Sequence, residues 1–226
     1  MIYGLYMSKL NQTLLKFELE QNFTYDDFFV SKCNYFAFSL IESWPKWEKN
    51  ILNIYGEKFS GKSHLSEIFK KNNKAIIIKN NEINEEFFKK IRFYENIILD
   101  NLEYINDENI IYSIINFVEQ YNKYLIVNSI NPINTIDFTL PDLKSRLKNC
   151  IYAKIEKPDD DMIFALILKH FSDRQIKIEK KVIEYITKRI ERSYGKILDF
   201  IYKVDQFSLI NKKSIDYKVI KKILEE

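Results

Sequence analysis

Eight consecutive residues carry the clearest chemistry in this 226-residue chain. They match the pattern G-x-x-x-x-G-K-[ST] at every required position and run Gly56-Glu57-Lys58-Phe59-Ser60-Gly61-Lys62-Ser63. The two glycines allow close backbone approach, so successive N–H groups can form a concave anion site at the start of a helix. Lys62 would supply a positive charge to the β- and γ-phosphates of a nucleotide, and Ser63 a hydroxyl to Mg²⁺. A chance turn is the alternative, but the apolar run before the motif and the helical pattern after it favour a phosphate-binding loop.

The residues around this motif refine the expectation. Many loops of this type carry a further glycine where this chain has Phe59. His64, directly after the motif, joins the candidate nucleotide-binding set. A metal-ligand role for His64 or His170 has no support, because neither histidine has partner ligands at a metal-binding spacing.

An acidic group follows a neighbouring apolar run. Residues 97–99 are Ile-Ile-Leu, and Asp100 comes next, where it would hold Mg²⁺ through water. An ordinary turn residue at a strand end is the alternative. The following residue, Asn101, is an amide that cannot act as a base, and Glu103 is the nearest substitute. Nucleotide binding is therefore better supported than fast hydrolysis.

The spacing of apolar residues predicts the elements that must position these groups. Helical spacing is found at 63–71 and at 107–120. Short β-branched runs predict strands at 51–55, 75–79, 97–100, 124–128 and 151–155. Strands that alternate with helices indicate an α/β domain with a parallel five-stranded sheet covered on both faces.

The pattern changes at Pro158, after which no strand is expected. Three aspartates at 159–161 suit a first helical turn, where the helix dipole favours negative charge. Helices are predicted at 159–172, 179–191, 194–209 and 216–224. We therefore expect an N-terminal segment over 1–22, an α/β nucleotide-binding domain over 23–157 and a small all-helical domain over 158–226.

Composition and charge exclude several classes of protein. The net charge of +3 is too small to argue for nucleic-acid binding by itself. No apolar run approaches the roughly 20 residues that span a bilayer, and the N-terminus lacks a secretory pattern. Cys33 and Cys150 form no Cys-x-x-Cys pair, so neither a zinc site nor a disulfide framework is expected. A cytoplasmic protein with reduced thiols and no membrane contact is the expectation.

Several stretches beyond the loop resemble the DnaA/Hda family of AAA+ proteins. Most AAA+ ATPases have an acidic residue at the position of Asn101. Residues 23–30, followed by Asn34, are similar to the family's opening segment, which borders the adenine. Residues 100–103, Asp-Asn-Leu-Glu, are similar to a D-N-I-E form, and residues 140–147 to an L-P-D-L-x-S-R-L element. The resemblance runs from about residue 23 to the C-terminus and implies a P-loop AAA+ domain with a helical lid.

The same resemblance implies roles for three side chains. Arg146 would be an arginine finger that reaches the γ-phosphate of ATP in a neighbouring subunit. Arg192 would reach the bound nucleotide from the lid, and Asn128 would be a polar phosphate sensor at the end of the fourth strand. Solvated arginines on charged helices are the alternatives, and Ile130 departs from the family's acidic residue near the sensor.

The N-terminal segment offers a partner motif. Gln12, Leu15 and Phe17 match the Q-x-x-L-x-F form by which regulatory members of the family bind the sliding clamp, the beta subunit of DNA polymerase. Leucine and phenylalanine would be anchors in an apolar pocket. A short amphipathic segment packed on its own domain is the alternative. We expect the 34 residues after Arg192 to complete a lid, since they are too few for a further domain of about 50 residues.

The resemblance thus implies a regulator of replication initiation. It would bind ADP or ATP with Mg²⁺, dock on the DNA-loaded clamp, and present Arg146 as the catalytic group that stimulates hydrolysis of DnaA-bound ATP, with little or no ATPase activity of its own. The alternatives are a helicase-loader-type ATPase, against which Asn101 argues, and a nucleotide-gated adaptor without stimulating activity. A homo-oligomer and a weak DNA contact through the lysine pairs at 212–213 and 221–222 stay open.

Overall fold

The structure is a computed structural model and describes residues 27–78, 85–105, 107–174, 178–211 and 217–225. The Gln12, Leu15 and Phe17 motif lies outside these residues. In chain order the elements are α1 (Tyr35–Ser43), β1 (Ile51–Tyr55), α2 (Lys62–Asn72), β2 (Ala75–Ile78), α3 (Glu85–Ile91), β3 (Asn96–Leu99), η2 (Leu102–Tyr104), α4 (Glu108–Gln120), β4 (Tyr124–Ser129), η3 (Ile133–Thr135), α5 (Pro141–Leu147), β5 (Ile151–Lys154), α6 (Asp160–Asp173), α7 (Lys180–Thr187), α8 (Tyr194–Asn211) and α9 (Tyr217–Glu225).

The five strands form one parallel sheet in the order β2-β3-β4-β1-β5. Their runs of Ile, Leu and Val suit strands that are buried on both faces. The buried exception in β1 is Asn53, whose amide donates to Val127 O at 2.9 Å and to Ser129 Oγ at 2.8 Å. The predicted α/β fold with a parallel five-stranded sheet is confirmed.

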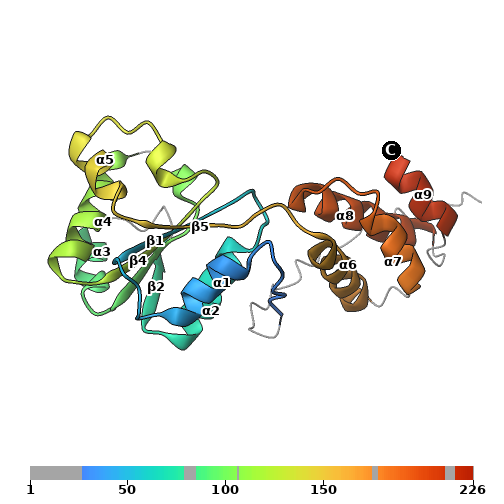
Figure 1. The fold of residues 1–226 in the computed structure, drawn as a ribbon, viewed down its shortest axis with the longest axis horizontal. Coiled ribbons are helices and arrows are strands. Elements are labelled where there is room, and N and C mark those ends of the chain that lie inside the picture. Colours follow the sequence, from blue (N-terminus) through green and yellow to red (C-terminus); the bar gives the residue numbers. More distant parts are fainter. Residues whose placement is uncertain (1–26, 79–84, 106, 175–177, 212–216, 226) are drawn as a thin grey trace, which may run out of the picture.

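Helices cover both faces of the sheet (Figure 1). Ile97 and Leu99 of β3 point into a core shared with α3, α4 and α5. Ile98, between them, points into the opposite core, shared with α1 and α2. This alternation follows from the two-residue period of a strand, and it leaves the ends of the strands free to carry polar groups.

The remaining helices, α6 to α9, enclose a core of their own to one side of the sheet (Figure 1). Phe171, Ile186 and Ile197 are among its fully buried members. Met162 and Tyr194 instead pack into the core beneath α1 and α2, so they join the helical part to the sheet. The proposed boundary at 157/158 falls in the linker between β5 and α6. No helix in the described ranges has the length and apolar character needed to cross a membrane.

The observed boundaries differ from the predicted ones in a few places. The helix expected over 179–191 ends at Thr187, because the chain must turn before α8 begins at Tyr194. Three α-helices, α1, α3 and α5, were not predicted from apolar spacing. In α1 the exposed Tyr35 and Phe36 blur the apolar periodicity, and α3 and α5 are each only 7 residues long.

Leu52, at the centre of the sheet, provides a test of the fold. Its side chain is fully buried in the core beneath α1 and α2, on a strand that pairs with both β4 and β5, so we expect Leu52→Ala to lower the free energy of unfolding by about 2–5 kcal/mol. Urea denaturation followed by circular dichroism measures the change. The control Leu168→Ala, at a position that is 44% exposed on α6, should stay within about 0.5 kcal/mol. Equal losses in the two variants would contradict the assigned core.

Candidate functional site

The phosphate-loop motif connects β1 to α2, and both of its glycines are required by the local backbone. A Cβ atom on Gly56 would lie 2.7 Å from the carbonyl oxygen of Ile155. Gly61 has φ of 95°, in the region that favours glycine, and directly precedes α2. The loop therefore wraps closely around the start of a helix, which is the geometry of an anion-binding loop.

Phe59 occupies the position where a glycine is common. Its φ of 66° lies in the left-handed region, so the loop keeps the curvature that a glycine would permit. This conformation costs a residue with a Cβ about 1–2 kcal/mol. Phe59 is 68% exposed, so burial of its side chain does not offset that cost.

Lys62 is a buried cation that contacts the phosphate loop. Its ammonium donates to Gly56 O at 2.7 Å and to Glu57 O at 2.8 Å. Burial lowers the pKa of Lys62, and the negative charges of Glu103, Asp100 and Glu57 offset part of this effect. The carboxylates thereby help to keep a charged ammonium in a poorly solvated place.

The ends of β3 and β4 and the first turn of α2 bring Asp100, Asn128 and Ser63 together. Asp100 Oδ1 accepts hydrogen bonds from Ser63 Oγ at 3.1 Å and from Asn128 Nδ2 at 2.8 Å. Asn128 Nδ2 also donates to Ser66 Oγ at 2.8 Å, whereas its buried Oδ1 atom has no hydrogen-bond partner within the described structure. Polar groups gather here because the carboxyl ends of parallel strands meet at one edge of the sheet.

This oxygen set fits Mg²⁺ held jointly with a nucleotide. Mg²⁺ usually takes one or two carboxylates and completes its shell with water and phosphate oxygens. The Ser63 hydroxyl and the Asp100 carboxylate are such ligands. Among the described residues no group of three or more His, Cys, Asp or Glu side chains could hold a metal ion alone.

Asn101 and Glu103 follow Asp100 but do not form a free general base. Asn101 has φ of 55°, a conformation that asparagine tolerates, and it precedes η2. The carboxylate of Glu103 accepts the backbone N–H of Ile130, just after β4. Glu103 therefore ties the end of β3 to the end of β4 beside the phosphate loop.

The segment before α1 lies against the loop. The Phe28 ring meets the His64 ring edge-on, with 5.1 Å between centroids, and a Cβ atom on Gly61 would lie 3.2 Å from Phe28. Asn34 accepts from Ser31 N at 2.9 Å and so stabilises the turn into α1. Of the family-like stretch 23–30, residues 23–26 lie outside the described ranges.

The helical part reaches the loop through Ser193 and Tyr194, which sequence analysis did not identify as site residues. Glu57 Oε1 accepts the backbone N–H of Tyr194 at 2.6 Å, and Glu57 Oε2 accepts from Ser193 Oγ at 3.2 Å. The predicted lid residue Arg192 instead pairs with Asp160 at 2.7 Å. An acidic residue in a variable position of the loop is the only sequence signal for this contact, and nothing in the spacing links it to residue 193.

Arg146 lies on α5, on the far side of the sheet from α2 and the helical part (Figure 1). It forms an ion pair with Glu119 of α4, and its guanidinium sits 5.8 Å from the ring centroid of Tyr112. The described structure therefore brings Arg146 together with α4 and not with the phosphate loop of the same chain.

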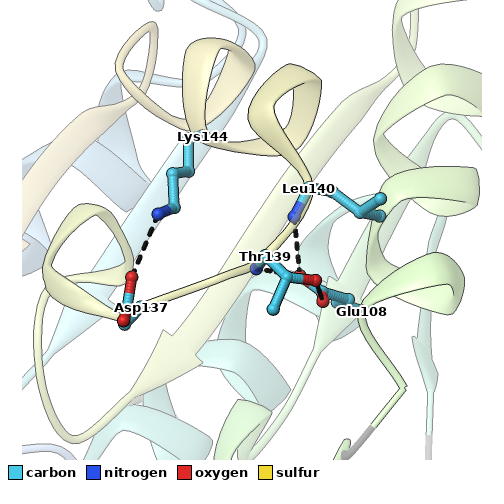
Figure 2. Close-up of polar contacts among 5 residues, drawn as sticks. All are labelled: Glu108, Asp137, Thr139, Leu140 and Lys144. Carbon is cyan, nitrogen blue, oxygen red and sulfur yellow. Dashed lines mark hydrogen bonds and ion pairs between the residues drawn. The ribbon is translucent and has the colours of Figure 1, made fainter.

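A second carboxylate holds the other end of α5 (Figure 2). Glu108, in the first turn of α4, accepts from Thr139 N at 2.7 Å, from Leu140 N at 3.2 Å and from the Thr139 hydroxyl. Lys144 pairs with Asp137 at 3.0 Å on the same segment. Because Glu108 and Glu119 both belong to α4, this helix fixes the position of Arg146.

Comparisons with known proteins agree with this architecture. The family model described as "Hda, lid domain" matches residues 159–224. DnaA from Thermoanaerobacter sp. (strain X514) is 24% identical over 236 residues, which are 92% of this chain and 53% of that protein. DnaA from Helicobacter pylori is 21% identical over 97% of this chain and 53% of that protein. The chain thus spans about half the length of the curated relatives it matches.

Solved structures show the same fold. Domain III of Thermotoga maritima DnaA superposes with a TM-score of 0.73 and 18% identity, over 91% of this chain and 96% of that chain. AMPPCP-bound DnaA from Aquifex aeolicus superposes with a TM-score of 0.66 and 19% identity, over 83% and 66%.

A five-stranded parallel sheet of this kind, with a phosphate loop after β1 and a helical lid, defines a P-loop protein of the AAA+ class. Within that class, the lid match and the DnaA relatives together support a protein of the DnaA/Hda family. The family resemblance seen in the sequence motifs is therefore confirmed.

The contacts of Glu108 predict a pH response at α5. Its hydrogen bonds to Thr139, then those to the Leu140 and Thr139 amides, hold the pKa of Glu108 below its usual value. A carboxylate with a lowered pKa stabilises the fold fully above the usual glutamate pKa, about 4.3, and loses this effect as the pH falls through the lower folded value. We therefore expect the hydrogen-exchange protection of the Thr139 and Leu140 amides, measured by NMR, to fall below about pH 4.3.

Glu108→Gln is the matched control, because its amide oxygen still accepts hydrogen bonds but does not titrate in this range. The protection of both amides should then lose this pH dependence. The same acid-induced loss in the glutamine variant would contradict the assigned role of Glu108.

Proposed function

We propose that this chain is a regulatory AAA+ protein that binds ADP or ATP with Mg²⁺ and stimulates the hydrolysis of ATP bound to DnaA. The observation that carries the proposal is the separation of two half-sites. Lys62, Ser63 and Asp100 meet at one edge of the sheet, whereas Arg146 lies on a helix remote from them. Such a layout suits a site that is completed between two subunits.

The loop would bind the nucleotide through groups that are already close together. Its backbone N–H groups and the start of α2 would cradle the phosphates, and the Lys62 ammonium would exchange its two carbonyl partners for phosphate oxygens. Ser63 and Asp100 would hold Mg²⁺, which supplies charge neutralisation between phosphate oxygens when bound. AMPPCP-bound DnaA, a fold neighbour, supports an adenine nucleotide as the ligand.

Slow hydrolysis by the chain itself follows from the groups beside Asp100. The Asn101 amide cannot take a proton from water, and the Glu103 carboxylate is engaged by the Ile130 N–H. Asn128 supports the site by orienting Asp100. Arg192 would require its ion pair with Asp160 to open before it could reach a nucleotide.

Arg146 would act on ATP held by a neighbouring DnaA subunit. A guanidinium matches phosphate oxygens in a bidentate geometry, and arginine fingers contribute about 10³–10⁵ in rate in related phosphoryl-transfer enzymes. In this chain the guanidinium is partly exposed and held by Glu119 and Tyr112. The incoming γ-phosphate would compete with Glu119 for Arg146.

Each of the three proposed segments of the chain would have its own role. Residues 1–22 would carry the clamp-binding motif of Gln12, Leu15 and Phe17, residues 23–157 the nucleotide, and residues 158–226 the lid. Docking on the DNA-loaded clamp would concentrate the regulator near DNA-bound DnaA, so initiation would be switched off after the clamp is loaded.

The arginine variant tests the proposal. We expect the native chain to accelerate hydrolysis of DnaA-bound ATP in the presence of DNA-loaded clamp, and Arg146→Ala to lose at least about 10³-fold of an arginine-finger effect. Hydrolysis is measured as conversion of radiolabelled ATP to ADP on DnaA. Lys144→Ala, on the same helix, removes a positive charge that pairs with the exposed Asp137, and should keep full stimulation. Unchanged stimulation by Arg146→Ala would rule out the trans-acting finger.

The clamp motif has a separate test in the same assay. Gln12→Ala combined with Phe17→Ala should remove both clamp binding and the clamp-dependent acceleration, because an anchor and the register-fixing amide are lost. Thr13→Ala combined with Lys16→Ala changes two variable positions of the motif and should leave both intact. Clamp binding without acceleration by the native chain would favour the adaptor, and ATP turnover by the chain alone would favour a loader-type ATPase.

A further inference from the structure

We infer that Glu57 is a positioning residue that transmits the state of the phosphate loop to the helical lid. This inference rests on the proposed binding of nucleotide by the loop. It concerns the second residue of the motif, one of its variable positions.

Glu57 stabilises the start of the longest lid helix. Its carboxylate accepts the Tyr194 N–H at 2.6 Å and the Ser193 hydroxyl at 3.2 Å, at the end where the 18-residue helix α8 begins. The first N–H groups of a helix lack intrahelical partners, and the helix dipole favours a negative charge there. The phosphate loop thus provides both the acceptor and the charge that α8 needs.

The beginning of α8 is also tied to the segments that flank the loop. Tyr194 is only 3% exposed, and its hydroxyl lies 3.4 Å from Glu156 O and 3.3 Å from Cys33 Sγ. Cys33 N donates to Asp159 Oδ2 at 3.2 Å, and Asp159 caps α6 by accepting from Met162 N at 2.8 Å. A displacement at Tyr194 therefore acts on α6 and α8 together, so these two lid helices would move as a unit.

Lys62 links this contact to the ligand. Its ammonium donates to the carbonyl oxygen of Glu57, the same residue whose side chain holds α8. A phosphate that draws the Lys62 ammonium toward itself removes that hydrogen bond from the Glu57 peptide. The peptide then adjusts, and its side chain carries the adjustment to Ser193 and Tyr194.

Arg192 does not provide the same connection in this structure. Its guanidinium pairs with Asp160, and both side chains are more than half exposed and belong to the helical part. The hydrogen bonds from Glu57 to residues 193 and 194 instead cross directly from the loop to the lid.

The test measures lid position rather than stability alone. Cysteines introduced by Gln120→Cys on α4 and Tyr202→Cys on α8 would carry nitroxide labels, because both positions are exposed whereas Cys33 and Cys150 are buried. Electron–electron resonance gives the distance distribution between the labels without nucleotide, with MgADP and with Mg-AMPPCP. Calorimetry confirms that each variant binds the nucleotide.

We expect the native chain to change its distance distribution when nucleotide binds, and Glu57→Ala to lose that change at nucleotide concentrations that calorimetry shows to be saturating for this variant. Glu57→Gln keeps an acceptor oxygen and should retain the change. If the alanine variant does not fold, Glu57→Asp serves instead, since its carboxylate is one methylene shorter and should also lose the change. Glu156→Ala, which removes a neighbouring carboxylate paired with Lys154, is the matched control and should behave as the native chain.

The outcomes separate this inference from the proposed function. Absence of nucleotide binding by the native chain overturns the proposed function, and the inference with it. Nucleotide binding with an unchanged distance distribution in the native chain, or with the native change preserved in Glu57→Ala and Glu57→Asp, overturns the inference alone.

Discussion

The structure depends on a positive charge that is held where water is scarce. Burying the Lys62 ammonium costs free energy unless acceptors and opposite charges surround it. The carbonyl groups of Gly56 and Glu57 provide the acceptors, and the carboxylates of Glu103, Asp100 and Glu57 provide the charges. Each carboxylate also ties down another element, so the surroundings of Lys62 connect β3, β4 and α8.

Much of the fold and part of the site could be predicted from the sequence, because their signals are local. The β-branched runs located the strands to within a residue or two, and the loop motif made Lys62 and Ser63 candidate nucleotide-binding residues. Asp100 was a candidate because it is an acidic residue at a strand end, and Asn128 because of the family resemblance; parallel topology brings both residues to one edge of the sheet. The helices α1, α3 and α5 were missed because their apolar spacing is irregular or too short to recognise.

The contacts that join distant parts of the chain could not be predicted in the same way. Glu57 and Tyr194 are 137 residues apart, and no periodicity links them. The left-handed backbone conformation of Phe59 could not be predicted either, because a phenylalanine side chain does not favour it. The family resemblance made Arg146 and Arg192 candidate site residues. Their ion pairs with Glu119 and Asp160 could not be predicted, because these pairs depend on how the helices pack.

The measurement that tests the account most directly is the affinity of the full chain for MgADP by isothermal titration calorimetry. We predict binding by the native chain and a loss of about 10- to 100-fold in Lys62→Ala, because a charge-assisted hydrogen bond contributes about 1.5–3 kcal/mol. Lys70→Ala, which removes an exposed lysine paired with Glu67 on α2, should bind as the native chain does. Absence of binding by the folded native chain, or unchanged affinity in Lys62→Ala, would contradict the assignment of the loop as a nucleotide site.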